Sequence, residues 1–169
     1  RLPNQMNWNT LKANTSNKIA NLFNSYFSSV FQKSLDIPLQ PAELPKIRLN
    51  NFTLNPSEVA DLLSKTKTCS LSSDPVPTFL LNSCPVILAP LVTQLFTVII
   101  KARKWPSDWK CSYITPIRKS GNPENVENYR PISILPQLSL ILEKLLFRYI
   151  YPQVRTSICN EQYGFTKKR

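Results

Sequence analysis

The spacing of apolar residues changes from a helical period to a two-residue period near residue 112, and this change limits the folds open to the chain. Over 17–33, 56–63 and 136–151, apolar residues recur at intervals of three and four positions. Over 112–119 the period becomes two, and 129–135 is a second short extended run. The first spacing is typical of helices with one buried face, and the second of strands. We therefore predict an α+β fold, mostly helical, with one two-stranded β-hairpin.

The segment 17–33 predicts a helix with a single apolar stripe, for which Ser16 or Asn17 is the expected N-cap. The helix is expected to close at Asp36 to Pro38. We expect the stripe to lie in a core, and the alternative is that it docks on another domain. Its members are Ile19, Leu22, Phe23, Tyr26, Phe27, Val30 and Phe31.

Two further helices have clear local signals. The second has Asn55 as its cap and Pro56 at its first helical position, and turns Val59, Leu62 and Leu63 inward. The third runs from Pro136 to Tyr151, and Pro152 is expected to end it. Its inward stripe is Leu138, Ile141, Leu142, Leu145, Leu146 and Tyr149, with Glu143, Lys144 and Arg148 away from it.

The segment 85–102 is almost wholly apolar, and Pro90 interrupts it. Its uninterrupted part is short for a bilayer, whose hydrocarbon core needs about 20 apolar residues. We therefore expect two abutting helices buried in the core and no membrane segment.

The predicted hairpin brings two cations together. In the register that places Ile117 opposite Ile132 and Thr115 opposite Ile134, Lys119 lies directly opposite Arg130. Like charges in that arrangement repel unless an anion lies between them. The register thus predicts a phosphate-binding element, and the alternative is that both side chains extend into solvent.

Composition excludes several kinds of site. The chain has no His, which excludes Ser-His-Asp relays and imidazole metal sites. Its two glycines are too few for a dinucleotide fingerprint or a phosphate-binding glycine loop. The scattered aspartates offer no convergent carboxylates for a pair of catalytic metal ions. Four cysteines, too irregularly spaced for a zinc module, are expected to be reduced and mostly buried: Cys69, Cys84, Cys111 and Cys159.

The net charge of +11 points to a polyanionic partner. Of the 21 basic residues, 13 lie at or after Lys101, where the segment carries +8. The predicted hairpin lies within this basic part, which makes it the candidate binding surface.

Residues 105–146 resemble the N-terminal part of reverse transcriptases from LINE-type (non-LTR) retrotransposons, the jockey-like group in particular. The motif "NYRPIS" after a "TPI" strand carries most of this resemblance. It extends upstream to "SDPVPTFLLN" and "IANLFNSYFSSVF", and downstream to "EQYGF".

The resemblance implies the fingers portion of a right-hand polymerase. On this interpretation, residues 1–50 are a linker and helical extension upstream of the polymerase domain. Residues 51–169 are the N-terminal part of the reverse transcriptase domain, and the palm is absent.

The resemblance also implies roles for single residues. Lys119 and Arg130 match the hairpin positions expected to close on the triphosphate of the incoming nucleotide. Further template or nucleotide contacts are expected from Arg118, Tyr129, Gln162, Gly164 and Phe165, of which Arg118 and Tyr129 would help to shape the hairpin.

The expected function is that of a truncated RNA-directed DNA polymerase that cannot polymerise alone. Its partners would be an RNA template, a DNA primer, a deoxynucleoside triphosphate, and the missing palm, thumb and endonuclease parts. Mg²⁺ is expected only for the intact enzyme, and the family implies an intracellular, nuclear location. The alternatives are a non-catalytic nucleic-acid-binding module and an inert relic of a retrotransposon.

Overall fold

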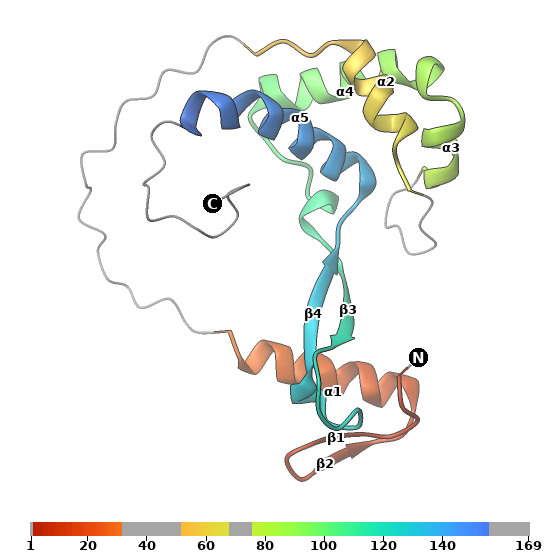
Figure 1. Cartoon of the computed structure of the whole chain (residues 1–169), viewed down its shortest axis with the longest axis vertical. Helices are drawn as coiled ribbons and strands as arrows, with labels where there is room; N and C mark the ends of the chain where they lie inside the picture. The colour runs from red at the N-terminus through yellow and green to blue at the C-terminus, as the bar shows by residue number, and fades with distance from the viewer. Residues whose placement is uncertain (1, 32–51, 68–75, 156–169) are drawn as a thin grey trace, which may run out of the picture. The chain divides into compact units, whose positions relative to one another are not determined.

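The computed structural model of the chain describes residues 2–31, 52–67 and 76–155 (Figure 1). The fold is α+β and mostly helical, as predicted, with two small antiparallel sheets. The elements, in chain order, are β1 (Met6–Trp8), β2 (Leu11–Ala13), α1 (Ser16–Ser29), α2 (Pro56–Ser64), α3 (Thr78–Ser83), α4 (Pro85–Ala102), the 3₁₀ turn η1 (Asp108–Lys110), β3 (Tyr113–Arg118), the 3₁₀ turn η2 (Val126–Asn128), β4 (Tyr129–Ile134) and α5 (Gln137–Val154).

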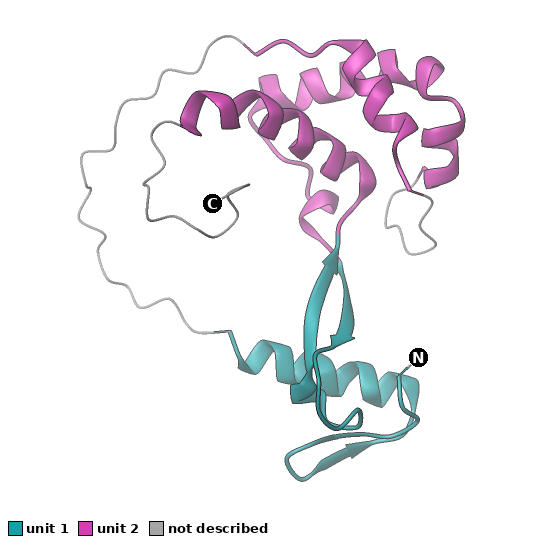
Figure 2. Ribbon diagram, viewed as in Figure 1, with its two compact units in different colours: residues 1–39, 113–134 teal, residues 40–112, 135–169 magenta. Residues whose placement is uncertain are grey.

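The chain folds into two compact units (Figure 2). Unit 1 combines residues 1–39 with 113–134, so the β3–β4 hairpin packs with the N-terminal segment. Unit 2 combines residues 40–112 with 135–169. The predicted division at residue 50 concerns regions of a longer polymerase, and it stays a prediction.

The core of unit 1 forms around α1, whose stripe is buried at Ile19, Leu22, Phe23 and Phe27. Met6 and Ala13 of the β1–β2 hairpin and Val126 and Tyr129 of the other hairpin complete this core. The prediction of a core-facing stripe is therefore confirmed for its first part.

The ends of α1 differ from the prediction. Thr15 occupies the N-cap position in place of Ser16 or Asn17, because its carbonyl accepts the first intrahelical hydrogen bond, from the Ile19 N–H at 2.8 Å. The helix ends at Ser29, before the expected close, and leaves Val30 and Phe31 exposed.

Unit 2 is built on α2, α4 and α5. Asn55 caps α2 as predicted, because its side chain accepts a hydrogen bond from the Ser57 N–H at 3.0 Å. The buried residues of this core are Val59, Leu62, Leu63, Leu81, Ala89, Val92, Phe96, Ile99, Trp109, Leu138, Ile141, Leu142 and Leu145. The predicted inward positions of α2 and most of those of α5 are thus confirmed.

Two prolines lie inside helices that they were expected to break. α4 is one continuous helix through Pro90, and α5 continues past Pro152 to Val154. Each proline removes one backbone hydrogen bond and strains the preceding turn. Burial of Ala89, Val92 and Phe96 in one core, on both sides of Pro90, offsets that cost in α4.

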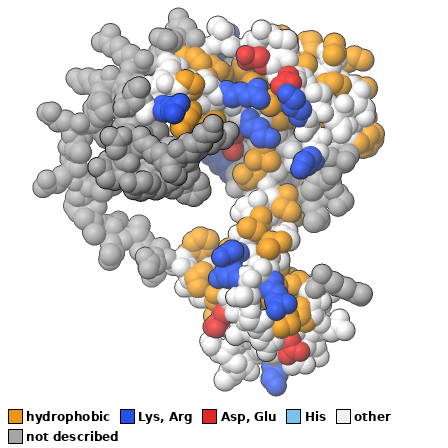
Figure 3. Space-filling model, in the orientation of Figure 1, with side chains coloured by type: hydrophobic (Ala, Val, Ile, Leu, Met, Phe, Trp, Pro, Cys, Tyr) orange, Lys and Arg blue, Asp and Glu red, His pale blue; other side chains and the backbone are white. Residues whose placement is uncertain are grey.

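The apolar helix α4 is buried on one face only, which corrects the expectation of full burial. Val86, Ile87, Leu91 and Val98 are exposed, and Figure 3 shows apolar side chains at the surface of both units. By length and composition α4 could cross a membrane. That is weak evidence, because core helices of globular proteins meet the same criterion.

Two of the four cysteines are exposed, so the expectation of burial is wrong for them. Cys84 lies at the junction of α3 and α4 and Cys111 directly follows η1, and both are free thiols in surface turns. Cys69 and Cys159 lie outside the described residues.

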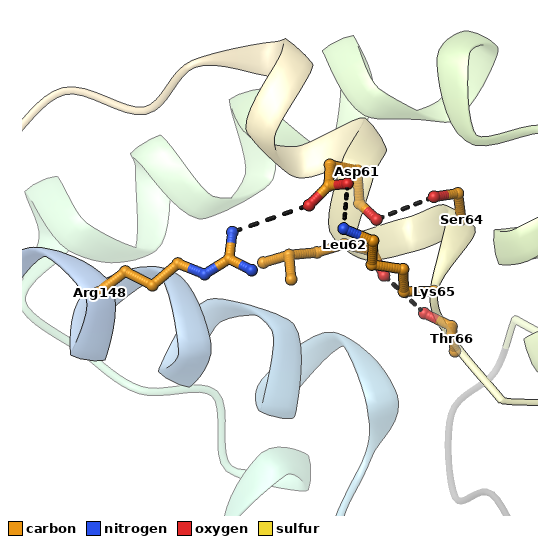
Figure 4. A network of polar contacts seen from close by, with 6 residues as sticks. All are labelled: Asp61, Leu62, Ser64, Lys65, Thr66 and Arg148. Carbon is orange, nitrogen blue, oxygen red and sulfur yellow. Dashed lines mark hydrogen bonds and ion pairs between the residues drawn. The ribbon is translucent and has the colours of Figure 1, made fainter. Parts of the chain in front are cut away.

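A small polar network joins α2 to α5 (Figure 4). The Asp61 carboxylate forms an ion pair with Lys65 one turn later and lies 3.8 Å from Nη1 of Arg148. The hydrogen bond from Lys65 is the largest effect and lowers the pKa of the Asp61 carboxyl. Desolvation opposes it, and the charges of Lys65 and Arg148 add to the lowering, so the net shift of the pKa is downward. The ionised carboxylate is therefore the form that the folded state favours.

We predict that Asp61→Asn reduces the pH dependence of stability in acid. Because the pKa of Asp61 is lowered on folding, its contribution is present above the unfolded carboxyl pKa of about 4 and is lost as the pH falls through the folded value. As the pH falls from 7 to 2, the urea midpoint for unfolding of the wild type should approach the midpoint of Asp61→Asn. A constant gap across this range would contradict the prediction, and Glu143→Gln on α5 is the charge-matched control.

A candidate phosphate-binding hairpin

The β3–β4 hairpin has a different register from the one predicted. Ile117 lies opposite Arg130 and Thr115 opposite Ile132, a shift of two residues along one strand. Lys119 follows the end of β3, and its N–H donates to the carbonyl of Asn128 at 2.7 Å. The direct opposition of Lys119 and Arg130 is therefore wrong.

The folded tip of the hairpin causes this shift. Asn125 caps η2 by accepting a hydrogen bond from the Glu127 N–H at 3.1 Å, and Asn128 ends this turn. The side-chain Nδ2 of Asn128 donates to the carbonyl of Asn122 at 2.9 Å. The turn thus presents the Asn128 carbonyl to Lys119, and the pairing of the strands begins there.

The shift keeps both cations on one face, because side chains alternate between faces with a period of two. Lys119 directly follows the last strand pair, Arg118 with Tyr129, and its N–H bonds to the Asn128 carbonyl. Arg130 is therefore its diagonal neighbour, and such neighbours in a ladder have Cα atoms about 7–8 Å apart. Both side chains are exposed, and neither forms an ion pair within the described parts of the chain. Two long cationic side chains at this spacing can converge on one anion.

The exposed face also carries apolar residues. Tyr113 and Ile117 of β3 and Ile132 of β4 share this face with Arg130, and each is about half exposed. Figure 3, in the orientation of Figure 1, shows basic and apolar side chains over this hairpin.

The opposite face of the hairpin holds it to α1. Tyr129 is only 4% exposed, and its ring meets the edge of Phe23 with centroids 5.1 Å apart. The Tyr129 hydroxyl donates to the carbonyl of Pro123 at 2.7 Å, and Nη2 of Arg118 donates to the carbonyl of Gly121 at 2.7 Å. Both side chains therefore shape the tip, and a nucleotide contact for either stays a prediction.

Each strand of the hairpin contains one proline, and the two prolines lie directly opposite each other. Because the Lys119 N–H donates to the Asn128 carbonyl, the alternation of the ladder makes Pro116 and Pro131 a pair whose backbone groups point outward. The prolines therefore cost no bond within the ladder and remove an N–H donor from each outer edge. This arrangement protects both edges from pairing with another strand.

A groove of about 750 Å³ lies between α1 and the hairpin, within unit 1. Phe27 and Phe31 line one side, and Ile114, Pro116 and Pro131 line the other. Sequence reasoning missed this groove, although the apolar stripe that continues past the end of α1 was a signal for it.

The remaining predictions concern three further contact residues and the metal ions. Gln162, Gly164 and Phe165 lie outside the described residues. Over residues 2–31, 52–67 and 76–155, no cluster of three carboxylate or thiol side chains could hold a metal ion. The described residues therefore do not fit the pair of Mg²⁺ ions that nucleotidyl transfer uses.

Comparison with known proteins gives the chain clear relatives. No protein-family model matches the sequence. The chain is 30% identical over 142 residues, or 80% of its length, to the probable RNA-directed DNA polymerase from transposon BS of Drosophila melanogaster. It is 28% identical over 75% of its length to the probable RNA-directed DNA polymerase from transposon X-element, and 29% identical over 83% to the RNA-directed DNA polymerase from mobile element jockey, both of the same species. It spans only 14–15% of the length of these relatives.

We predict that Gly121→Ala loosens the hairpin tip. Gly121 has φ +80°, and an added Cβ would lie 2.8 Å from Nδ2 of Asn128. A non-glycine residue held in such a conformation costs roughly 1–3 kcal/mol. Hydrogen exchange of the Lys119 amide should therefore become faster, whereas Ser120→Ala should leave it unchanged. Unaltered exchange in Gly121→Ala would show that the tip does not depend on this glycine.

Proposed function

This chain belongs to the family of RNA-directed DNA polymerases from non-LTR mobile elements such as jockey, and on that premise we propose that it supplies the fingers part of such a polymerase. The polymerase names belong to relatives of which the chain matches about 15%. The proposal therefore concerns one portion of a larger catalytic protein.

Within that portion, the proposed role of the β3–β4 hairpin is to bind the triphosphate of the incoming nucleotide. The observation that carries this role is the exposure of Lys119 and Arg130 as diagonal neighbours on one face. Their charges would compensate the negative charge that develops on the phosphates during transfer. The proposed role of both side chains is electrostatic and involves no proton transfer.

The tip supports this role by limiting the motion of the two cations. Lys119 is anchored through its backbone to Asn128, and Arg130 follows the buried Tyr129 directly. Anchored backbones lower the entropy that the side chains lose when they close on an anion. The RNA template and DNA primer are the proposed nucleic-acid partners of the same polymerase.

We predict that deoxythymidine triphosphate shifts the backbone amide NMR signals of Lys119 and Arg130 in the full chain. Lys119→Ala and Arg130→Ala should each weaken this binding about threefold to tenfold, because each removes one charge-assisted contact. Lys12→Ala, which removes an exposed cation from β2 of the same unit, is the matched control. An equal loss in Lys12→Ala would mean that unit 1 attracts the nucleotide only through its net charge, against the proposal.

The proposal assigns catalysis to carboxylates elsewhere in the larger protein. We predict that this chain alone, with primed RNA, deoxynucleoside triphosphates and Mg²⁺, gives no primer extension on a sequencing gel. Extension that survives repurification of the protein would contradict this assignment. Nucleotide binding to the hairpin is measured separately, so the two results test different parts of the proposal.

A further inference from the structure

The helix α5 carries a stripe of alternating cations and aromatic rings on its outer side. Lys144, Phe147, Arg148, Tyr151 and Arg155 follow one another at intervals of three, one, three and four residues. At about 100° per residue, these positions fall within an arc of roughly 100°, so they share one face; Arg155 is the C-cap of α5, and its backbone keeps the helical conformation. We call these five residues the α5 stripe.

The two aromatic rings of the α5 stripe stack on each other at the surface. Their centroids are 4.8 Å apart and their planes differ by 20°. Phe147 is 61% exposed, whereas the core positions Leu142 and Leu145 on the same helix are buried. Tyr151 is only partly exposed, so the flat apolar surface open to solvent belongs mainly to Phe147, and such a surface can accept a further flat ring.

The cations on either side of the rings are available to an anion. Within the described residues, Lys144 and Arg155 form no ion pair. Arg148 approaches Asp61 through Nη1 only, at 3.8 Å (Figure 4), and its side chain is 53% exposed. Positive charge thus lies on both sides of the stacked rings.

We propose that the α5 stripe binds single-stranded nucleic acid, with a base stacked on Phe147 and Tyr151 and backbone phosphates beside Lys144 and Arg155. Aromatic platforms flanked by cations are how sequence-tolerant proteins hold single strands. The stripe is about 16 Å long, which suits a short run of nucleotides. The stripe lies in unit 2 and the nucleotide-binding hairpin in unit 1, so this inference does not rest on the proposed function.

A single strand fits these observations better than a duplex or a protein. In a duplex the internal base faces are already stacked on each other, so only the terminal pairs offer a face to Phe147. An apolar protein surface would have to leave the charges of Lys144 and Arg155 without partners at the edge of the rings, which is unfavourable.

The test measures binding of fluorescently labelled U12 RNA and dT12 DNA to the full chain by anisotropy, over a range of salt concentrations. Phe147→Leu and Tyr151→Leu should each weaken binding about fivefold or more without changing the salt dependence. Lys144→Ala and Arg155→Ala should each reduce the slope of log K against log salt by about 0.7. The separation of these two effects distinguishes stacking from general attraction.

The control is Phe79→Leu, which replaces an exposed phenylalanine of α3 in the same unit. The proposal is overturned if Phe147→Leu weakens binding no more than this control. It is also overturned if Phe147→Leu weakens binding of a duplex of equal length as much as it weakens binding of the single strands. The same holds if binding of an acidic polyglutamate peptide depends equally on Phe147. Retention of the Phe147 effect in a Lys119→Ala, Arg130→Ala double variant would support a site separate from the hairpin.

Discussion

The contact between Tyr129 and Phe23 is the constraint on which unit 1 depends. It joins the start of β4 to the middle of α1, two segments that are far apart in the sequence. Because the Tyr129 ring is buried and its hydroxyl is bonded to Pro123, the first residue of β4 has a fixed position and orientation. Alternation along the strand then turns Arg130 and Ile132 outward. The candidate phosphate site is thus a consequence of aromatic packing on the opposite face of the same hairpin.

Local signals in the sequence were sufficient for much of the fold. The cap at Asn55, the apolar spacing of α1, α2 and α5, and the two-residue period of β3 are all confirmed. The register was not predictable in the same way, since it depends on how the tip between the strands folds. The turn η2, capped by Asn125, uses residues that would otherwise be available for pairing between the strands. It therefore shifts the pairing by two positions. Because the shift is even, the faces were predicted correctly although the partners were not.

Tertiary packing explains the remaining errors. Pro90 and Pro152 were expected to end helices, but a proline costs only a few kcal/mol, and burial on both sides of Pro90 compensates for it. The candidate site shows the same limit. Lys119 and Arg130 could be selected by charge and by resemblance. Phe147 and its stacking partner Tyr151 were overlooked, because nothing in an apolar pattern marks the Phe147 ring as exposed. Lys144 and Arg148 were assigned correctly to the outer side of α5.

Unit 1 is formed from two segments that are far apart in the sequence, and this has a consequence for synthesis of the protein in cells. α1 leaves the ribosome about 100 residues before Tyr129, its packing partner, so at 5–20 residues per second it waits for roughly 5–20 seconds. During that interval Phe23 and Phe27 lack the β3–β4 hairpin that covers them in the folded unit. The nascent chain therefore presents an aromatic helix to chaperones and to neighbouring chains, and the yield of folded protein should depend on the rate of translation between the two segments.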